Sequence, residues 1–159
     1  MQTETELSTT TAGLFELVLE VTDLERSERF YREALGLKLA NRWGTDPYDD
    51  DAREAVFLEI GPHAFLGLWP RETGGENALA GGRGGSHVHF ALLVTYGTLD
   101  VMQIRLEERG VMVVLEKNFG QGNRAIYIND PDGHVVELTE RTTDWAGEPM
   151  TSVPVVKGQ

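Results

Sequence analysis

One order of predicted elements, which occurs twice, constrains the fold of this 159-residue chain more than any other feature. Strand-forming and amphipathic helical runs follow one another as strand, helix and three strands, first over residues 13–71 and again over residues 87–140. Adding 71 to a residue number in the first copy reaches a similar residue in the second, as for His63 and His134. The sequence therefore predicts an α+β fold of two tandem βαβββ modules.

Turn and capping signals set the limits of these elements. Thr22 and Glu25 form a capping-box pattern before the first helix, and Gly36 and Gly110 follow the two helices where glycine commonly ends a helix. The apolar spacing places Leu24, Ser27, Tyr31 and Leu35 on one face of the first helix, and Leu99, Met102 and Leu106 on one face of the second. The predicted strands are 14–21, 37–43, 55–60 and 63–69, then 87–94, 111–116, 124–128 and 134–140, and the predicted helices are 25–35 and 98–109.

The segments outside the modules differ from them in composition. Residues 1–12 are polar and read as a flexible N-terminal tail, and residues 72–86 form a Gly-rich linker. Residues 141–159 follow the last predicted strand as a C-terminal extension.

Charge and composition exclude several classes of function. The net charge of −12 disfavours a nucleic-acid partner and an anionic membrane surface, because both require clustered Lys and Arg. The chain has no cysteine, so it has no disulfide, thiolate metal site or Cys nucleophile. We find no signal peptide and no apolar run near the roughly 20 residues of a membrane span, and expect a soluble, cytoplasmic protein.

Three stretches resemble a known family. VTDLERSERFYREALGLKL resembles the first-module signature of the vicinal oxygen chelate superfamily, NDPDGHVVEL resembles the end of its second module, and HVHFALLV lies between them. This superfamily includes glyoxalase I, fosfomycin-resistance proteins, bleomycin-binding proteins and extradiol dioxygenases. The resemblance covers residues 13–140 and implies paired βαβββ modules whose strands form a curved mixed sheet around a cavity.

The resemblance also implies a divalent metal ion and its ligands. Family members carry ligands on the first and last strands of the modules, which here implies Glu16, His87 (71 residues further on) and Glu137. The first-module counterpart of Glu137 at this spacing is Leu66, which cannot ligate, so the chain supplies three ligands. Two carboxylates and an imidazole suit Fe, Mn, Ni, Co or Zn. Strand alternation independently gives Glu16, Val18 and Glu20 one face, and an ionised glutamate in an apolar strand is costly unless it is paired or metal-bound.

Other polar side chains have two interpretations each. His89 shares a strand face with His87, so it is a candidate catalytic acid–base group, or else a packed strand residue. Glu16 itself could lie on the solvent face of an edge strand. His63 and His134 sit beside turns and are expected to be exposed.

Two functions remain open from the sequence. The first is a metal-dependent enzyme of the glyoxalase or dioxygenase type that acts on a small substrate chelated through vicinal oxygens. The second is a metal-free protein that sequesters a small aromatic or cationic compound, with Trp43 and Trp69 as candidate wall residues. The resemblance further implies a homodimer, with each site built by one chain or by two.

Overall fold

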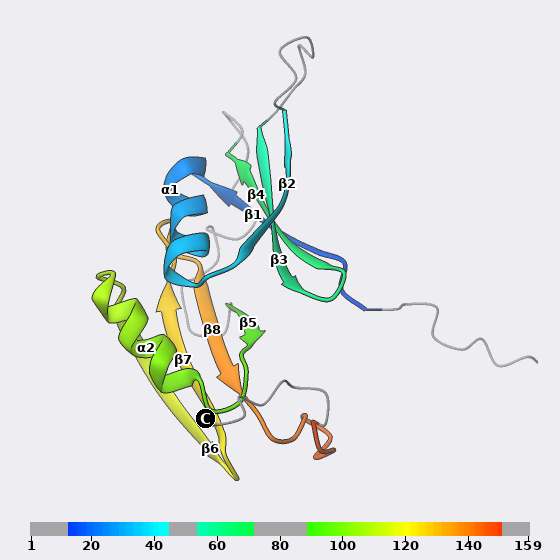
Figure 1. The fold of residues 1–159 in the computed structure, drawn as a ribbon, viewed down its shortest axis with the longest axis vertical. Helices are drawn as coiled ribbons and strands as arrows, with labels where there is room; N and C mark the ends of the chain where they lie inside the picture. Colours follow the sequence, from blue (N-terminus) through cyan, green and yellow to red (C-terminus); the bar gives the residue numbers. More distant parts are fainter. Residues whose placement is uncertain (1–12, 45–53, 72–88, 151–159) are drawn as a thin grey trace, which may run out of the picture.

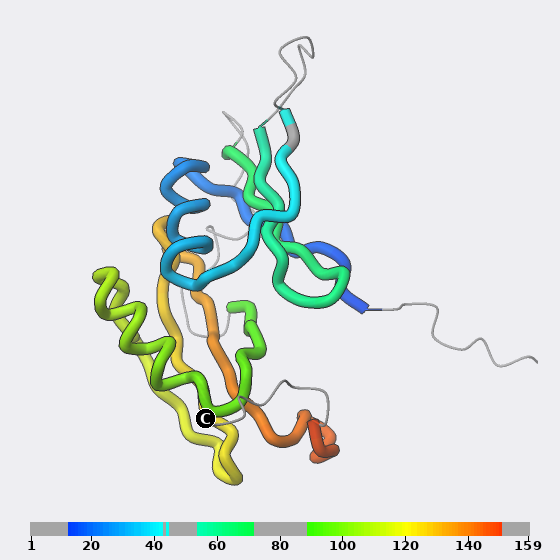
Figure 2. The backbone as a smooth tube through the Cα atoms, in the orientation of Figure 1, coloured from blue at the N-terminus to red at the C-terminus, as the bar shows by residue number. Residues whose placement is uncertain are grey.

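The structure, a computed structural model, describes residues 13–44, 54–71 and 89–150. It confirms both predicted modules, which occupy separate halves of the molecule (Figure 1). Figure 2 follows the chain from the first module into the second and on to the C-terminal extension. The elements are β1 Glu16–Val21, α1 Leu24–Arg29, η1 Phe30–Ala34, β2 Lys38–Trp43, β3 Ala55–Gly61, β4 Ala64–Pro70, β5 His89–Leu93, α2 Leu99–Glu108, β6 Val113–Gly120, β7 Asn123–Asn129 and β8 Val135–Glu140.

Each module forms a mixed four-stranded sheet of its own. The strand order is β1-β4-β3-β2 in the first sheet and β5-β8-β7-β6 in the second. In both, the first strand pairs in parallel with the last, and the remaining pairs are antiparallel. The α+β class is therefore confirmed, and the shared topology explains why one element order occurs twice in the sequence.

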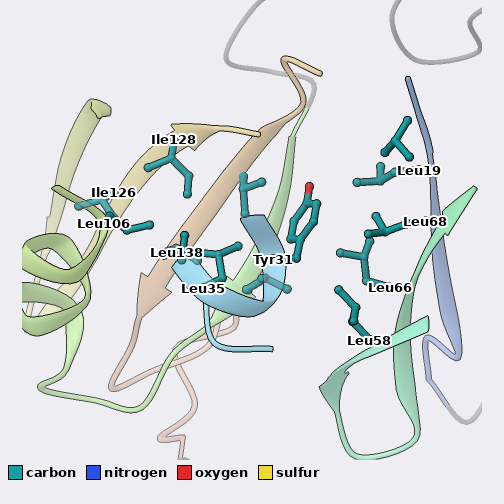
Figure 3. Close-up of a cluster of buried hydrophobic side chains, with 14 of the residues drawn as sticks. Leu19, Tyr31, Leu35, Leu58, Leu66, Leu68, Leu106, Ile126, Ile128 and Leu138 are labelled. Carbon is teal, nitrogen blue, oxygen red and sulfur yellow. The ribbon is translucent and has the colours of Figure 1, made fainter. Parts of the chain in front are cut away.

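One hydrophobic core joins the two modules. Each sheet turns an apolar face inward, and the helix over residues 24–34 lies between them, so that Tyr31 and Leu35 contact side chains from both sides (Figure 3). The Tyr31 side chain is completely buried. The largest strand residues of this core are Leu19, Leu58, Leu66 and Leu68 from the first sheet and Ile126, Ile128 and Leu138 from the second.

The N-cap of the first helix lies one residue later than the capping-box pattern predicts, and the helix begins at Leu24, one residue before the predicted start. Asp23 is the N-cap, and its carboxylate accepts a hydrogen bond of 2.9 Å from the Arg26 backbone N–H. Thr22 is not the cap, because its backbone N–H and its hydroxyl both donate to Asp132 of the second module. Thr22 therefore hydrogen-bonds the second module instead of capping the helix as the local pattern predicted.

The spacing of 71 fails at the last strand of each module. Gly67 pairs with Phe57 as Glu137 pairs with Tyr127, and both differences (137 − 67 and 127 − 57) are 70. Leu66, the predicted counterpart of Glu137, is instead fully buried in the core. A shift of one residue moves a strand side chain to the opposite face of the sheet. The counterpart of Glu137 is thus Gly67, and the conclusion that the first module has no fourth ligand there still holds.

Three predicted segments lie wholly or partly outside the described residues. These are the N-terminal tail, the Gly-rich linker and the part of the C-terminal extension beyond residue 150. Among the residues that are described, no helix has the length and apolar character needed to cross a membrane.

Candidate functional site

We call the face of each sheet that points away from the hydrophobic core its open face. The open face of the second sheet carries a carboxylate in contact with an imidazole. Glu137 is only 5% exposed, and its Oε2 lies 3.0 Å from Nε2 of His89. The contact follows from the register, since Ala91 pairs with Glu137 and His89 pairs with Val135 on the parallel neighbour. The structure therefore brings together two of the four predicted site residues, and both have the chemistry of metal ligands.

Tyr127 completes this cluster and was not predicted from the sequence. Its hydroxyl hydrogen-bonds Glu137, and its ring lies edge-on to His89 with 5.4 Å between centroids. Burial, the hydrogen bond to Glu137 and the charge of that carboxylate raise the pKa of Tyr127, which keeps the phenol protonated. The signal that could have found it is cross-strand pairing, because Tyr127 lies directly opposite Glu137.

The open face of the first sheet carries Glu16 at the edge of a cavity. The cavity has a volume of about 420 Å³, and Trp69, one of the two predicted wall residues, lines it. Oε1 of Glu16 is buried and has no hydrogen-bond partner among the described residues. Such an atom is costly unless something outside the described residues satisfies it. The prediction that Glu16 and Val18 share one strand face agrees with their pairing to Phe65 and Gly67.

The described residues do not bring the predicted metal ligands into one cluster. Across residues 13–44, 54–71 and 89–150, no three carboxylate or histidine side chains are close enough to hold one metal ion. Glu16 therefore does not join the pair formed by His89 and Glu137 within one chain. His87 lies outside the described residues, as does the side chain of Trp43.

The histidines beside turns differ from each other. His63 is exposed, as predicted, and has a positive φ of 57° in the β3–β4 hairpin. The prediction that His134 is exposed is wrong, since its side chain is only 13% exposed and its Nδ1 lies 2.8 Å from the Asp130 carboxylate. Asp130 is fully enclosed because the Tyr31 hydroxyl, which donates to it at 2.8 Å, covers it from the first module.

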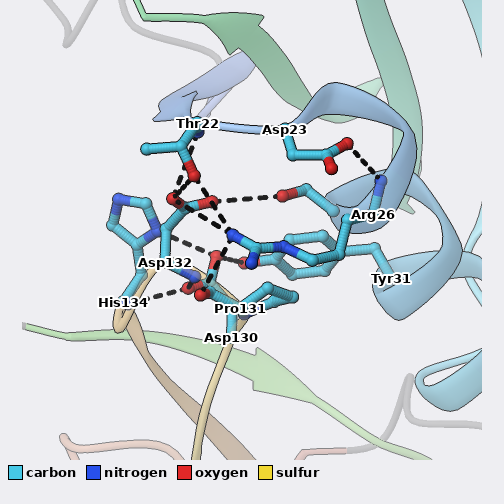
Figure 4. A network of polar contacts seen from close by, with 9 residues as sticks. Thr22, Asp23, Arg26, Tyr31, Asp130, Pro131, Asp132 and His134 are labelled. Carbon is cyan, nitrogen blue, oxygen red and sulfur yellow. Dashed lines mark hydrogen bonds and ion pairs between the residues drawn. The ribbon is translucent and has the colours of Figure 1, made fainter.

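This polar junction holds the β7–β8 turn against the first helix (Figure 4). Burial raises the pKa of Asp130, but the hydrogen bond and charge of His134 outweigh burial and hold that pKa below its usual value. The hydrogen bond to Asp130 raises the pKa of His134 above its ordinary 6.5, against the effect of burial. The start of the family-like stretch, residues 130–134, therefore holds the two modules together, whereas Glu137 from the same stretch belongs to the candidate site.

A family model describes this architecture. The model of the Glyoxalase/Bleomycin resistance protein/Dioxygenase superfamily matches residues 13–138. The chain belongs to this superfamily. The match spans both modules, so the superfamily assignment covers both open sheet faces and their candidate ligands.

Three proteins illustrate what this superfamily member is similar to. The glutathione transferase FosA of Serratia marcescens is 32% identical over 126 residues, which cover 79% of each chain. An integron cassette protein from a sewage-outfall metagenome is 26% identical with a TM-score of 0.60, covering 82% of this chain and 100% of the other. The FosX of Listeria monocytogenes, solved with Mn(II) and a dihydroxypropylphosphonic acid, is 20% identical with a TM-score of 0.59, covering 80% and 91% of the two chains, and shows the fold alone.

Proposed function

We propose that this superfamily member is a divalent-metal-dependent enzyme that acts on a small substrate through two adjacent oxygens. The observation that carries the proposal is the contact between His89 and the buried Glu137, on the open face of a sheet. A buried carboxylate and an adjacent imidazole can together supply two ligands to a divalent metal ion. The Mn(II) present in the FosX structure supports a metal of this class.

The residues present fit such an ion. Glu16 offers a buried carboxylate oxygen that no described residue hydrogen-bonds, and Glu137 offers a second carboxylate beside His89. In our proposal Glu16 and Glu137 are two ligands, and the third is a histidine. We assign it to His89 because His89 contacts Glu137, while His87 keeps its predicted ligand role as the competing assignment.

The bound ion would stabilise negative charge that develops on the chelated substrate oxygens. Tyr127 orients the Glu137 carboxylate through its hydroxyl, which stays protonated because its pKa is raised. His89, if His87 supplies the ligand instead, has an imidazole at the same face and can accept or donate a proton there.

We also propose that a second copy of the chain completes the site. Glu16 and Glu137 do not cluster within one chain, although both lie on open sheet faces. Apolar side chains on these faces are exposed, with Val18 at 43% and Leu93 at 46%. Pairing two chains so that the open faces meet would cover these residues and bring Glu16 of one copy to Glu137 of the other.

Metal binding by single variants tests the ligand assignment. We expect wild-type protein to bind about one Mn(II) per chain, and H89A and E137Q to weaken that affinity more than about 100-fold, because each removes a ligand. Electron paramagnetic resonance of titrated Mn(II) measures the free ion. His63→Asn is the matched control, since His63 is exposed and asparagine tolerates its positive φ. Weakening by H87A with full affinity in H89A would transfer the ligand role to His87.

A two-tag experiment tests the shared site. E16A and E137A chains, each with its own affinity tag, are co-expressed and the mixed dimer is purified through both tags. If two chains build each site, the mixed dimer has one intact site and one doubly altered site, and binds about one Mn(II) per dimer. If one chain builds each site, every site has lost a ligand and the mixed dimer binds no tight Mn(II).

A metal-free binding protein is the second candidate, favoured by the cavity beside Glu16. Its rings and its carboxylate could hold a small aromatic or cationic compound without a metal. Failure of wild-type protein to bind Fe, Mn, Ni, Co or Zn tightly would favour this function over the enzyme.

A further inference from the structure

The cavity on the open face of the first sheet has an unusual lining. Its volume of about 420 Å³ is within the range of small-ligand sites and leaves room for a ring and its substituents. Among the described residues, its walls contain four aromatic side chains and no Lys or Arg. The lining residues are Phe15, Glu16, Ala40, Asn41, Phe57, Phe65 and Trp69.

The aromatic walls form two edge-to-face pairs. Phe15 and Phe65 have ring centroids 5.5 Å apart and planes at 72°, and Phe57 and Trp69 have centroids 6.2 Å apart and planes at 90°. Edge-to-face pairs are a favoured aromatic geometry, so each ring is held by its partner. The walls therefore offer flat apolar surfaces of the kind on which another ring packs.

Gly67 leaves room for three of the side chains that line this cavity. It lies in the centre of β4, paired with Phe57 on one side and Val18 on the other. A Cβ atom at this position would lie 2.7 Å from Oε1 of Glu16, 3.3 Å from Nε1 of Trp69 and 3.4 Å from Cε1 of Phe57. Glycine inside a strand commonly marks a place where another group approaches the backbone closely.

Charge decides which group the cavity accepts. Glu16 is the one charged side chain among the described lining residues, and no cation lies there to balance a second negative charge. Away from any ion bound at Glu16, an anionic group placed against the aromatic walls would be poorly solvated and would have no Lys or Arg among the described lining residues to pair with. The aromatic walls therefore suit an uncharged group better than a phosphonate or a carboxylate.

We infer that this cavity binds an uncharged aromatic ring of the substrate, directly beside the oxygens that a metal at Glu16 would hold. The position next to the metal rests on the proposed function, whereas the ring preference rests on the cavity itself. The substrate class is then an aryl compound with an uncharged ring next to two adjacent oxygens.

A matched pair of chelators tests the ring preference. Benzohydroxamic acid and acetohydroxamic acid present the same two adjacent oxygens, but only the first carries a ring. We expect calorimetry on the Mn(II)-loaded full chain to give a Kd for benzohydroxamic acid lower by on the order of 10- to 100-fold, because a ring is removed from water. Equal dissociation constants for the two compounds would overturn the inference.

A filled cavity provides the specific control. Ala40 lines the cavity and is exposed, so Ala40→Leu adds bulk there without touching a proposed ligand. We expect A40L to lose the preference for benzohydroxamic acid and to keep its affinity for acetohydroxamic acid. Lys38→Leu, on the same strand but outside the cavity, should change neither value. If A40L does not fold, the ratio of the two dissociation constants in the wild-type protein is enough to test the ring preference.

A metal-free arm separates this inference from the proposed function. Benzamide has a ring but chelates metals poorly, and saturation-transfer NMR reports its contact with metal-free protein. Contact in wild type and K38L that is lost in A40L would support the ring site even if no metal binds and the proposed enzyme is abandoned. Tight metal binding without benzamide contact or chelator preference would overturn the ring site alone.

Discussion

At the residue scale, Gly67 shows how a missing side chain shapes the candidate site. Its backbone does not need glycine for conformational reasons, because its φ is not positive, whereas its neighbours need the space. Oε1 of Glu16 in particular lies only 2.7 Å from the position that the Cβ of any other residue would take. Gly67 therefore positions a proposed metal ligand without touching the metal.

Gly67→Ala is expected to weaken Mn(II) binding by about 10- to 100-fold, the usual cost of disturbing a ligand's support. The free energy of unfolding should change by less than about 1 kcal/mol, because alanine is tolerated in strands as well as glycine is. Gly61→Ala, whose Cβ would meet Ala64 at an ordinary 3.9 Å, is the matched control. In an E16A background G67A should have no further effect on Mn(II), and an additive effect would contradict the positioning role.

At the element scale, the β7–β8 turn and the first helix are held by an ion pair that depends on pH. The folded pKa of His134 is raised above 6.5, so its stabilising effect is complete below that pH and is lost as pH rises through the folded pKa. The pKa of Asp130 is lowered from 3.8, so its effect is complete above that pH and is lost as pH falls. The ion pair between Asp130 and His134 therefore stabilises the folded protein most between about pH 4 and 6.5.

His134→Gln should lower the free energy of unfolding by about 1.5–3 kcal/mol at pH 5.5, the range for a hydrogen bond to a charged group, and by less at pH 8.5. Urea unfolding at the two pH values measures the difference. His63→Asn, at an exposed histidine, should show no such pH dependence. An equal loss at both pH values would mean that the imidazolium charge does not contribute.

At the scale of the whole molecule, the exposed apolar residues differ in what we expect to cover them. Leu93 lies on the open sheet face of the proposed pairing surface, while Val101 is 66% exposed on α2. Leu93→Asp should raise the dimer dissociation constant at least about tenfold, because a charge would be buried at the contact, and Val101→Asp should not. Analytical ultracentrifugation gives both constants. An unchanged Leu93→Asp dimer would move the pairing surface elsewhere.

The sequence by itself determined that the chain has two βαβββ modules. Periodicity and turn signals are local, and the same order of strand, helix and three strands occurs twice. It also determined that Glu16 and Val18 share one strand face, since alternation depends on the backbone alone. Only the tertiary structure decided that Asp23 caps the helix, that Gly67 corresponds to Glu137, and that Tyr127 and His89 contact Glu137. Register and side-chain competition decide these points, and both arise from contacts between residues far apart in the sequence.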